Sequence, residues 1–242
     1  MNREYHKWYS PALGKDMELL VFGHAGASVV FFPPRTGRFF EYEDWGLIEM
    51  LQSKIEQGFL QIYCVDSVDR ESFYSEASYP DDKIARHLQY EHYIIDEVLP
   101  LVHHKNPGTY LISAGCSLGA YHAVNFAFKY PHQFNKIVAM SGRYDLTKQL
   151  RHYDDLLHGY WNENIYFNMP EQYILNISDQ NTLDQLRKLE IVLAVGREDI
   201  FLESNTFLSH ALTDKGIQNN LYIWNEEAHK AVYWKKMVDI YL

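Results

Sequence analysis

Short apolar runs alternate with longer amphipathic stretches along most of the chain. The runs are bounded by glycine, proline or polar residues and have the lengths of buried strands. They cover residues 17–22, 28–32, 60–65, 109–116, 136–141, 191–195 and 220–224. The stretches between them predict helices at 44–57, 81–104, 118–130, 182–189, 204–215 and 232–242. Strands that alternate with helices indicate an α/β fold, with a mostly parallel central sheet and helices on both faces.

Composition and charge restrict the classes of function. The 242 residues suit a single domain, 1–242, with a substantial core. The formal net charge of −10 repels phosphate backbones, so nucleic acid is not an expected partner. The N-terminus has no signal-peptide pattern and no apolar run is long enough to span a membrane, so we expect no membrane partner and a cytoplasmic location. Cys64 and Cys116 lie in apolar stretches and are expected to be buried, reduced thiols. Whether copies of the chain form a homo-oligomer is left open.

The strongest local signal is the sequence G-C-S-L-G at 115–119, which follows a predicted strand and opens a predicted helix. A nucleophilic serine must project from a tight turn between strand and helix. Glycines two residues to either side leave room for that turn. The free N–H groups at the helix start then point toward developing negative charge. The motif therefore predicts Ser117 as a nucleophile.

A nucleophilic serine needs a base, and the base needs an orienting acid. Around this kind of turn the three follow in the order serine, acid, histidine. Asp199 comes directly after the buried strand 191–195 and is the preferred acid, with Glu198 and Asp145 as alternatives. His229 lies in a loop after a late strand and is the preferred base. The other histidines after the serine lie in helices, at a helix end or before the acid: His122, His132, His152, His158 and His210.

The oxyanion of such a reaction needs two backbone N–H donors. One is expected from Leu118, directly after the nucleophile, and the other from the loop after the strand at 28–32. Pro33 and Pro34 have no N–H, which leaves Arg35 and then Thr36 as the second donor.

Cofactor and metal sites have little support. His87 and His92 are five residues apart on a predicted helix and point to different sides, so they do not form a zinc motif. Neither a G-x-G-x-x-G sequence nor a Walker loop is present. We expect no metal and no cofactor.

Several segments resemble the putative-esterase family of α/β-hydrolases, the group that contains S-formylglutathione hydrolases, feruloyl esterases and mycolyl transferases. The segments are GCSLGAYHAVNFAFKYP, FNKIVAMSGR, FFPPRTGRFFEYEDWG, YCVDSVDRESFY and YWNENIYFNMPEQYI. The resemblance covers nearly the whole chain and implies an α/β-hydrolase fold. It also implies Ser117 as nucleophile, Asp199 in GREDI as acid and His229 in AHKAVYW as base, in agreement with the residue-by-residue reasoning.

Together these features predict a serine hydrolase of the carboxylesterase type, which acts on a small ester or thioester through an acyl-enzyme. The alternatives are an acyltransferase with the same triad and a non-catalytic binding protein of the same fold. The aromatic-rich segment 142–179 is expected to form a cap over the site, with Tyr160 and Trp161 as walls of the substrate pocket.

The helix predicted at 81–104 carries a carboxylate on its apolar stripe. Its apolar residues recur at helical spacing, and Glu91 falls midway between Leu88 and Ile95 on the same side. A carboxylate is costly to bury unless it is hydrogen-bonded or paired. We expect Glu91 to be buried and to support the serine turn or neighbouring loops through hydrogen bonds. A local rotation of the helix and a catalytic acid role are the alternatives.

Overall fold

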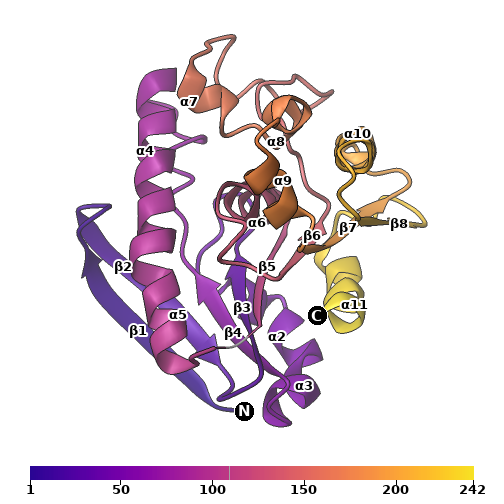
Figure 1. Cartoon of the computed structure of the whole chain (residues 1–242). Helices are drawn as coiled ribbons and strands as arrows, with labels where there is room; N and C mark the ends of the chain where they lie inside the picture. Colours follow the sequence, from indigo (N-terminus) through magenta and orange to yellow (C-terminus); the bar gives the residue numbers. More distant parts are fainter. Residues whose placement is uncertain (109) are drawn as a thin grey trace.

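Eight strands form one sheet in the computed structural model, which describes residues 1–108 and 110–242 (Figure 1). They are β1 (Arg3–Ser10), β2 (Lys15–Phe22), β3 (Ala27–Phe32), β4 (Leu60–Val65), β5 (Leu111–Cys116), β6 (Lys136–Met140), β7 (Glu190–Gly196) and β8 (Asn220–Trp224). Their spatial order is β1-β2-β4-β3-β5-β6-β7-β8, and only the β1–β2 and β2–β4 pairs are antiparallel in this described sheet. The prediction of a mostly parallel sheet is confirmed. Thr109, which begins the strand predicted at 109–116, lies outside the described residues.

The edge strand β1 is not predicted from the sequence. Its residues alternate between exposed and half-buried side chains, so it carries no continuous apolar run. The strand pairs along its whole length with β2, from Arg3 opposite Phe22 to Ser10 opposite Lys15. An edge strand needs a partner on one side only, and charged residues on its open side discourage pairing with other chains. A prediction based on apolar runs therefore misses this strand, because its composition is polar.

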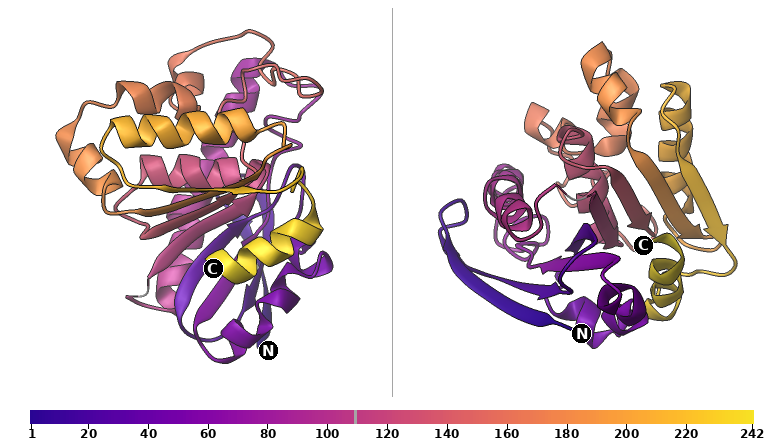
Figure 2. Two further views of the ribbon diagram at one scale, coloured as in Figure 1. Left: turned by 90° about the vertical axis from the view of Figure 1, so that its right-hand side faces the viewer. Right: turned by 60° about the horizontal axis from the view of Figure 1, so that its bottom comes forward.

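Helices cover both faces of the sheet, and strand periodicity explains why. In β3, Val29 and Phe31 enter one core while Val30 and Phe32 enter the other, as expected for a strand buried on both faces. Figure 2 shows α6 and α10 on one face, and α2, α3 and α11 on the other. The helices are α1 (Glu41–Asp44), α2 (Leu47–Met50), α3 (Gln52–Glu56), α4 (Pro80–His92), α5 (Leu99–Lys105), α6 (Leu118–Lys129), α7 (Glu163–Tyr166), α8 (Pro170–Tyr173), α9 (Gln180–Leu186), α10 (Leu202–Asp214) and α11 (Ala231–Tyr241), with a π-helical η1 (Tyr93–Val98) and a 3₁₀ η2 (Ile174–Asn176).

Two predicted helices are interrupted. The helix predicted at 44–57 is divided into α1, α2 and α3, because Gly46 adopts a left-handed conformation with φ of 71° between the first two. The helix predicted at 81–104 is continuous from α4 through η1 to α5, but its middle is a π-helix. Pro100 has no N–H, and its ring clashes with the carbonyl of Asp96, so a regular α-helix cannot continue through this point.

The segment 142–179 contributes no strand to the described sheet and contains only α7, α8 and η2 as helices. Four of its side chains pack with residues of three other segments in a small third core, formed by Phe73, Ile84, Leu118, Tyr121, Leu146, Leu157, Ile165 and Met169. Through these contacts the segment lies against the first turn of α6 and the start of α4 (Figure 1). Within the described residues, no helix combines the length and apolar character needed to cross a bilayer.

Candidate active site

Ser117 occupies the turn between β5 and α6 with φ of 58° and ψ of −119°. This backbone conformation is rare for a residue with a side chain, and it is held by the Ser117 N–H, which donates to the Met140 carbonyl at 2.8 Å. The flanking glycines are required by close packing. A Cβ on Gly115 would lie 2.2 Å from the Gly119 backbone, and one on Gly119 would lie 2.1 Å from the Phe32 carbonyl oxygen. The G-x-S-x-G spacing is therefore explained by the packing of the turn.

Tyr42 of α1 also supports the serine turn, and sequence reasoning missed it. Its hydroxyl donates to the Phe32 carbonyl at 2.6 Å and accepts from the Cys116 N–H at 2.9 Å. Burial raises the pKa of this hydroxyl well above its usual value, so it remains a neutral donor. Tyr42 thus joins the end of β3 to the end of β5 directly beneath the nucleophile.

The structure places Ser117, His229 and Asp199 in one hydrogen-bonded line. The Ser117 hydroxyl lies 3.1 Å from His229 Nε2, and His229 Nδ1 lies 3.0 Å and 3.2 Å from the two carboxylate oxygens of Asp199. Asp199 is buried and also accepts from the Phe201 N–H at 3.0 Å. The imidazole packs between the rings of Phe201 and Trp234, with centroids 5.4 Å and 5.2 Å away. These contacts fix the orientation of the ring.

The acid and the histidine meet because the loops after two neighbouring strands pair with each other. The Arg197 N–H donates to the Trp224 carbonyl at 2.8 Å, and the Glu198 N–H donates to the Glu226 carbonyl at 3.0 Å. The two loops approach so closely that a Cβ on Gly196 would lie 1.9 Å from the Glu227 carbonyl oxygen. Pairing of β7 with β8 therefore continues past the strands and brings Asp199 to His229.

The alternative acids and His122, the next histidine after Ser117 in the sequence, have other partners or face solvent. Asp145 is buried, but its oxygens bond to Thr147 and Gln172. The side chain of Glu198 is exposed to solvent. His122 is buried on α6, where its Nε2 lies 3.2 Å from Asp69 Oδ1. None of these three has a hydrogen bond to Ser117 or His229 in the part of the chain that the structure describes.

The geometry of the loop after β3 distinguishes between the two candidate oxyanion donors. The Thr36 N–H donates to Asp69 Oδ2 at 3.0 Å and is therefore occupied. The N–H groups of Arg35 and Leu118 have no acceptor in the described residues, and both residues line the cavity above Ser117. A turn closed by the Gly37 N–H on the Pro34 carbonyl, at 2.8 Å, holds Arg35 in place. Arg35 rather than Thr36 is thus the free donor.

Asp69 is a second residue that sequence reasoning missed. Besides Thr36 and His122, it has a backbone carbonyl that accepts from the Ser72 and Tyr74 N–H groups and so forms the turn after β4. Thr36 has φ of 54°, an uncommon conformation for a β-branched residue, and its hydrogen bond to Asp69 stabilises it. The available signal was the position of Asp69 four residues after a buried strand, where site residues gather in parallel sheets.

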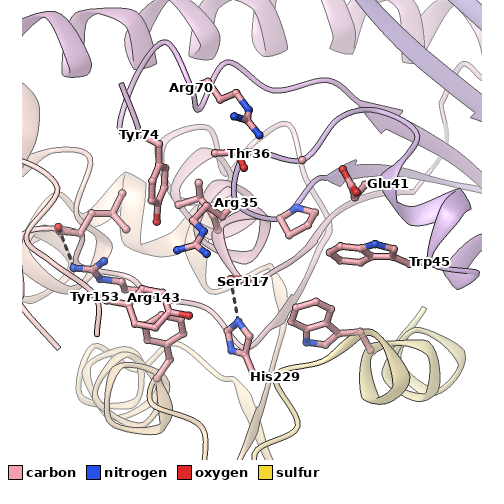
Figure 3. A pocket seen from close by; sticks show the side chains of 16 residues that line it. Arg35, Thr36, Glu41, Trp45, Arg70, Tyr74, Ser117, Arg143, Tyr153 and His229 are labelled. Carbon is pink, nitrogen blue, oxygen red and sulfur yellow. Dashed lines mark hydrogen bonds between the residues drawn. The ribbon is translucent and has the colours of Figure 1, made fainter. Parts of the chain in front are cut away.

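A cavity of about 360 Å³ opens above Ser117 (Figure 3). Ser117, Leu118 and His229 line its floor. In Figure 3, Arg35, Tyr74, Arg143 and Tyr153 lie on one side of Ser117, and Glu41 and Trp45 lie on the other. On the second side the rings of Trp45 and Trp234 stack with centroids 5.9 Å apart. The volume suits a small ligand.

The expectation that Tyr160 and Trp161 form walls of this cavity is corrected by the structure. Neither lines it, and the two residues are 41% and 60% exposed. The Tyr160 hydroxyl donates to Asp81 at the start of α4, at 2.7 Å, which holds this part of the segment 142–179 toward α4. Tyr153, from the same segment, lines the cavity instead. Aromatic content alone did not show which ring faces inward.

Glu91 is buried and hydrogen-bonded, as expected, but its partners are not at the serine turn. Its oxygens accept from Lys129 Nζ and, at 2.7 Å, from the Tyr130 hydroxyl. Both partners lie at the end of α6, roughly 18 Å along the helix from its start at a rise of about 1.5 Å per residue. The role as a direct support of the serine turn is therefore corrected to one at the opposite end of that helix.

Comparison with known structures identifies the fold. A ferulic acid esterase superposes with a TM-score of 0.78 at 15% identity, over 100% of this chain and 96% of the other. An S-formylglutathione hydrolase from Agrobacterium tumefaciens gives 0.75 at 16% identity, over 98% and 92% of the two chains. MPT51 (FbpC1) from Mycobacterium tuberculosis gives 0.71 at 12% identity, over 99% and 96%. The fold is that of the α/β-hydrolases.

A family model described as "Putative esterase" matches residues 41–234, which include Ser117, Asp199 and His229. The chain therefore belongs to the putative esterase family, and the resemblance found in the sequence is confirmed. Membership assigns the protein to the hydrolases that cleave ester bonds. A comparison with curated proteins gave no match.

Proposed function

We propose that this protein is a serine esterase in which Ser117 forms an acyl-enzyme. The observation that carries the proposal is the line of hydrogen bonds from Asp199 through His229 to Ser117, which ends in the cavity. A nucleophile, a base and an orienting acid within hydrogen-bond reach form the constellation that acyl transfer requires. The substrate is an ester or thioester small enough for this cavity.

In the first half-reaction, Ser117 Oγ attacks the substrate carbonyl carbon while its proton passes to His229 Nε2. The His229 Nδ1–H donates to Asp199, which stabilises the resulting imidazolium. The N–H groups of Leu118 and Arg35 donate to the oxyanion that forms on the carbonyl oxygen. The tetrahedral intermediate then collapses, and the leaving alcohol or thiol takes the proton from His229 Nε2. The acyl group remains on Ser117 Oγ.

In the second half-reaction, water donates a proton to His229 Nε2 and its oxygen attacks the acyl carbon. Collapse of the second intermediate breaks the bond to Ser117 Oγ, which recovers its proton from His229. The products are a carboxylic acid and free enzyme. An alcohol in place of water would make the enzyme an acyltransferase, and adding acceptor alcohols to the assay distinguishes the two reactions.

Cys116, directly before Ser117, is not a competing nucleophile. Its side chain is fully buried, and burial raises the pKa of the thiol, so the reactive thiolate does not form near neutral pH. The Ser117 hydroxyl, by contrast, faces the base and the cavity.

The proposal is tested with a fluorophosphonate probe and 4-nitrophenyl butyrate. Wild-type protein should be labelled, with the probe on the peptide that contains Ser117, and should hydrolyse the ester. Ser117→Ala should lose both, whereas Ser53→Ala, which removes an exposed serine on α3, should keep both. Labelling that persists in Ser117→Ala would contradict the assignment. Wild-type protein that shows neither labelling nor turnover would favour the non-catalytic alternative.

A further inference from the structure

The cavity above Ser117 differs in charge from the rest of the molecule. The chain as a whole has 32 acidic residues against 22 lysines and arginines. Three arginines nevertheless line the cavity, Arg35, Arg70 and Arg143, and Glu41 is the single acidic residue among its described lining. A cluster of positive charge in a chain of net charge −10 is not explained by composition.

These three arginines also lack the acidic partners that four of the other six arginines in the chain have. Arg3, Arg38, Arg86 and Arg187 each pair with an acidic side chain. Within the described residues, none of the three cavity arginines has a carboxylate within 4.0 Å. In the part of the chain that the structure describes, no carboxylate therefore pairs directly with these three guanidinium groups. Clefts lined by one sign of charge attract ligands of the opposite sign.

Arg143 is the buried member of the cluster. It is only 3% exposed, and its Nε and Nη2 donate to the carbonyls of a loop, those of Asp145, Leu146, Lys148 and Asp154. Its Nη1 is buried and has no hydrogen-bond acceptor among residues 1–108 and 110–242. Burial lowers the pKa of Arg143 although the nearby acids Asp145 and Asp155 oppose the shift, and the guanidinium remains charged at neutral pH. A buried cation without a directly paired carboxylate is costly, and an anion bound beside it would reduce that cost.

Arg35 and Arg70 also line the cavity, and both are exposed. The Arg35 guanidinium lies between two rings, 5.6 Å from the centroid of Tyr74 and 5.9 Å from that of Tyr153. The Tyr153 ring also lies 6.0 Å from the Arg143 guanidinium. Stacking on aromatic rings limits the positions of Arg35 and leaves its N–H donors free for a ligand in the plane of the guanidinium. Figure 3 shows Arg35 and Arg143 on the same side of Ser117.

We propose that Arg35, Arg70 and Arg143 form an anion-binding subsite of the active site, and that the substrate ester carries a carboxylate or similar anionic group that binds there. The proposal rests on the serine esterase function proposed above. Arg35 and Arg70 donate hydrogen bonds to the anion. Arg143 supplies a fixed positive charge from its buried position at the side of the cavity. The anion belongs either to the acyl part of the ester or to its alcohol part.

Three chromogenic esters distinguish these arrangements. 4-Nitrophenyl butyrate is neutral, mono-4-nitrophenyl glutarate carries a carboxylate on the acyl part, and 3-carboxy-4-nitrophenyl butyrate carries one on the alcohol part. The quantity measured is the preference, the ratio of kcat/KM for each anionic ester to that for the neutral ester. We expect one anionic ester to be preferred by about 10-fold or more, since its carboxylate accepts charge-assisted hydrogen bonds that the neutral ester lacks. The preference should shrink as salt screens the charges.

The variants Arg35→Met and Arg70→Met should each lower that preference about 5-fold or more, because each removes a charged donor. The matched control is Lys188→Met. It also removes one exposed positive charge, but it lies before β7, at the end of the strand opposite to Asp199. Its preference should equal that of the wild type. These two arginines are the first choice because Arg143 also holds the loop carbonyls, so its replacement would affect folding.

The result that overturns the subsite is a wild-type protein that hydrolyses the neutral ester at least as well as both anionic esters. Arginine variants that keep the wild-type preference would overturn it as well. In either case fluorophosphonate labelling of Ser117 would show that the esterase function stands while the anion subsite does not. Absence of both labelling and turnover in the wild type would remove the esterase function, and the subsite with it.

Discussion

The floor and the arginine wall of the cavity are built in different ways. Ser117, Asp199 and His229 of the floor follow the ends of β5, β7 and β8, and neighbouring strands or paired loops set their positions. The arginine wall, formed by Arg35, Arg70, Tyr74, Arg143 and Tyr153, comes from longer loops after β3, β4 and β6. The floor therefore depends on sheet register, whereas the wall depends on how loops pack against one another. Chemistry is accordingly easier to predict from sequence than specificity.

The largest expected effect is on the floor. Asp199→Asn should lower kcat about 10³–10⁴-fold, because an amide in place of the carboxylate favours the wrong imidazole tautomer. Glu198→Gln, which changes the exposed acid next to it, is the control and should remain close to wild type. Steady-state hydrolysis of 4-nitrophenyl butyrate measures both variants. A loss below about 10-fold for Asp199→Asn would remove this residue from the triad.

A smaller effect is expected where the wall meets the floor. Asp69→Asn replaces one acceptor oxygen with a donor and weakens the hold on Thr36 or on His122. Because this loop positions the Arg35 N–H, kcat should fall about 10–100-fold, less than for complete loss of an oxyanion donor. KM for the neutral ester should change little. Asp66→Asn is the control. Asp66 lies in the same loop after β4 as Asp69, but its carboxylate pairs with Arg38. Equal losses in the two variants would indicate general damage to the loop.

A third change should affect neither region. Glu91→Ala removes the acceptor of Lys129 and Tyr130, and we expect it to lower the free energy of unfolding by about 1–3 kcal/mol. Glu91→Gln keeps an acceptor and should lose less. Because the site lies at the opposite end of α6, kcat/KM of both variants should stay within about 2-fold of wild type. Urea denaturation and ester hydrolysis measure the two quantities, and a large drop in kcat with normal stability would restore a link to the serine turn.

The smallest effect concerns His87, a buried residue that packs against His122, the partner of Asp69. Burial lowers the pKa of His87 well below its usual value, and electrostatic interactions with His122 and Lys129 act in the same direction. The folded protein thus keeps His87 neutral, while the unfolded chain takes up a proton as pH falls below about 6.5. Stability is therefore lost as pH falls below that value, with a slope that approaches about 1.4 kcal/mol per pH unit from this group. His87→Gln should lose correspondingly less between pH 6.5 and 5.5 in urea denaturation. Parallel pH curves for the two proteins would contradict this.

The division between floor and wall also describes what could be predicted from the sequence. Local patterns predict the boundaries of β4 and β8, because a strand is encoded by its own residues and their neighbours. Local patterns and chain order also predict the choice of Ser117, Asp199 and His229. The helical position of His122 argues against a role as base, but it does not reveal that the side chain contacts Asp69, because that contact depends on tertiary packing. Tyr153 and Trp161 are both aromatic residues of one segment. Only tertiary contacts decide that the first lines the cavity and the second faces solvent.

Tyr42 shows how a sheet can open above a site without leaving backbone groups unsatisfied. The β3–β5 ladder ends where Phe32 lies opposite Gly115, and the two strands are no longer paired beyond these residues. The Tyr42 hydroxyl then takes the place of the next rung, since it accepts from the Cys116 N–H and donates to the Phe32 carbonyl. A side chain thereby extends the hydrogen-bonding of the sheet across a widening gap. Replacing Tyr42 with Phe would keep the packing of the ring but leave two backbone groups without this partner beneath the serine turn.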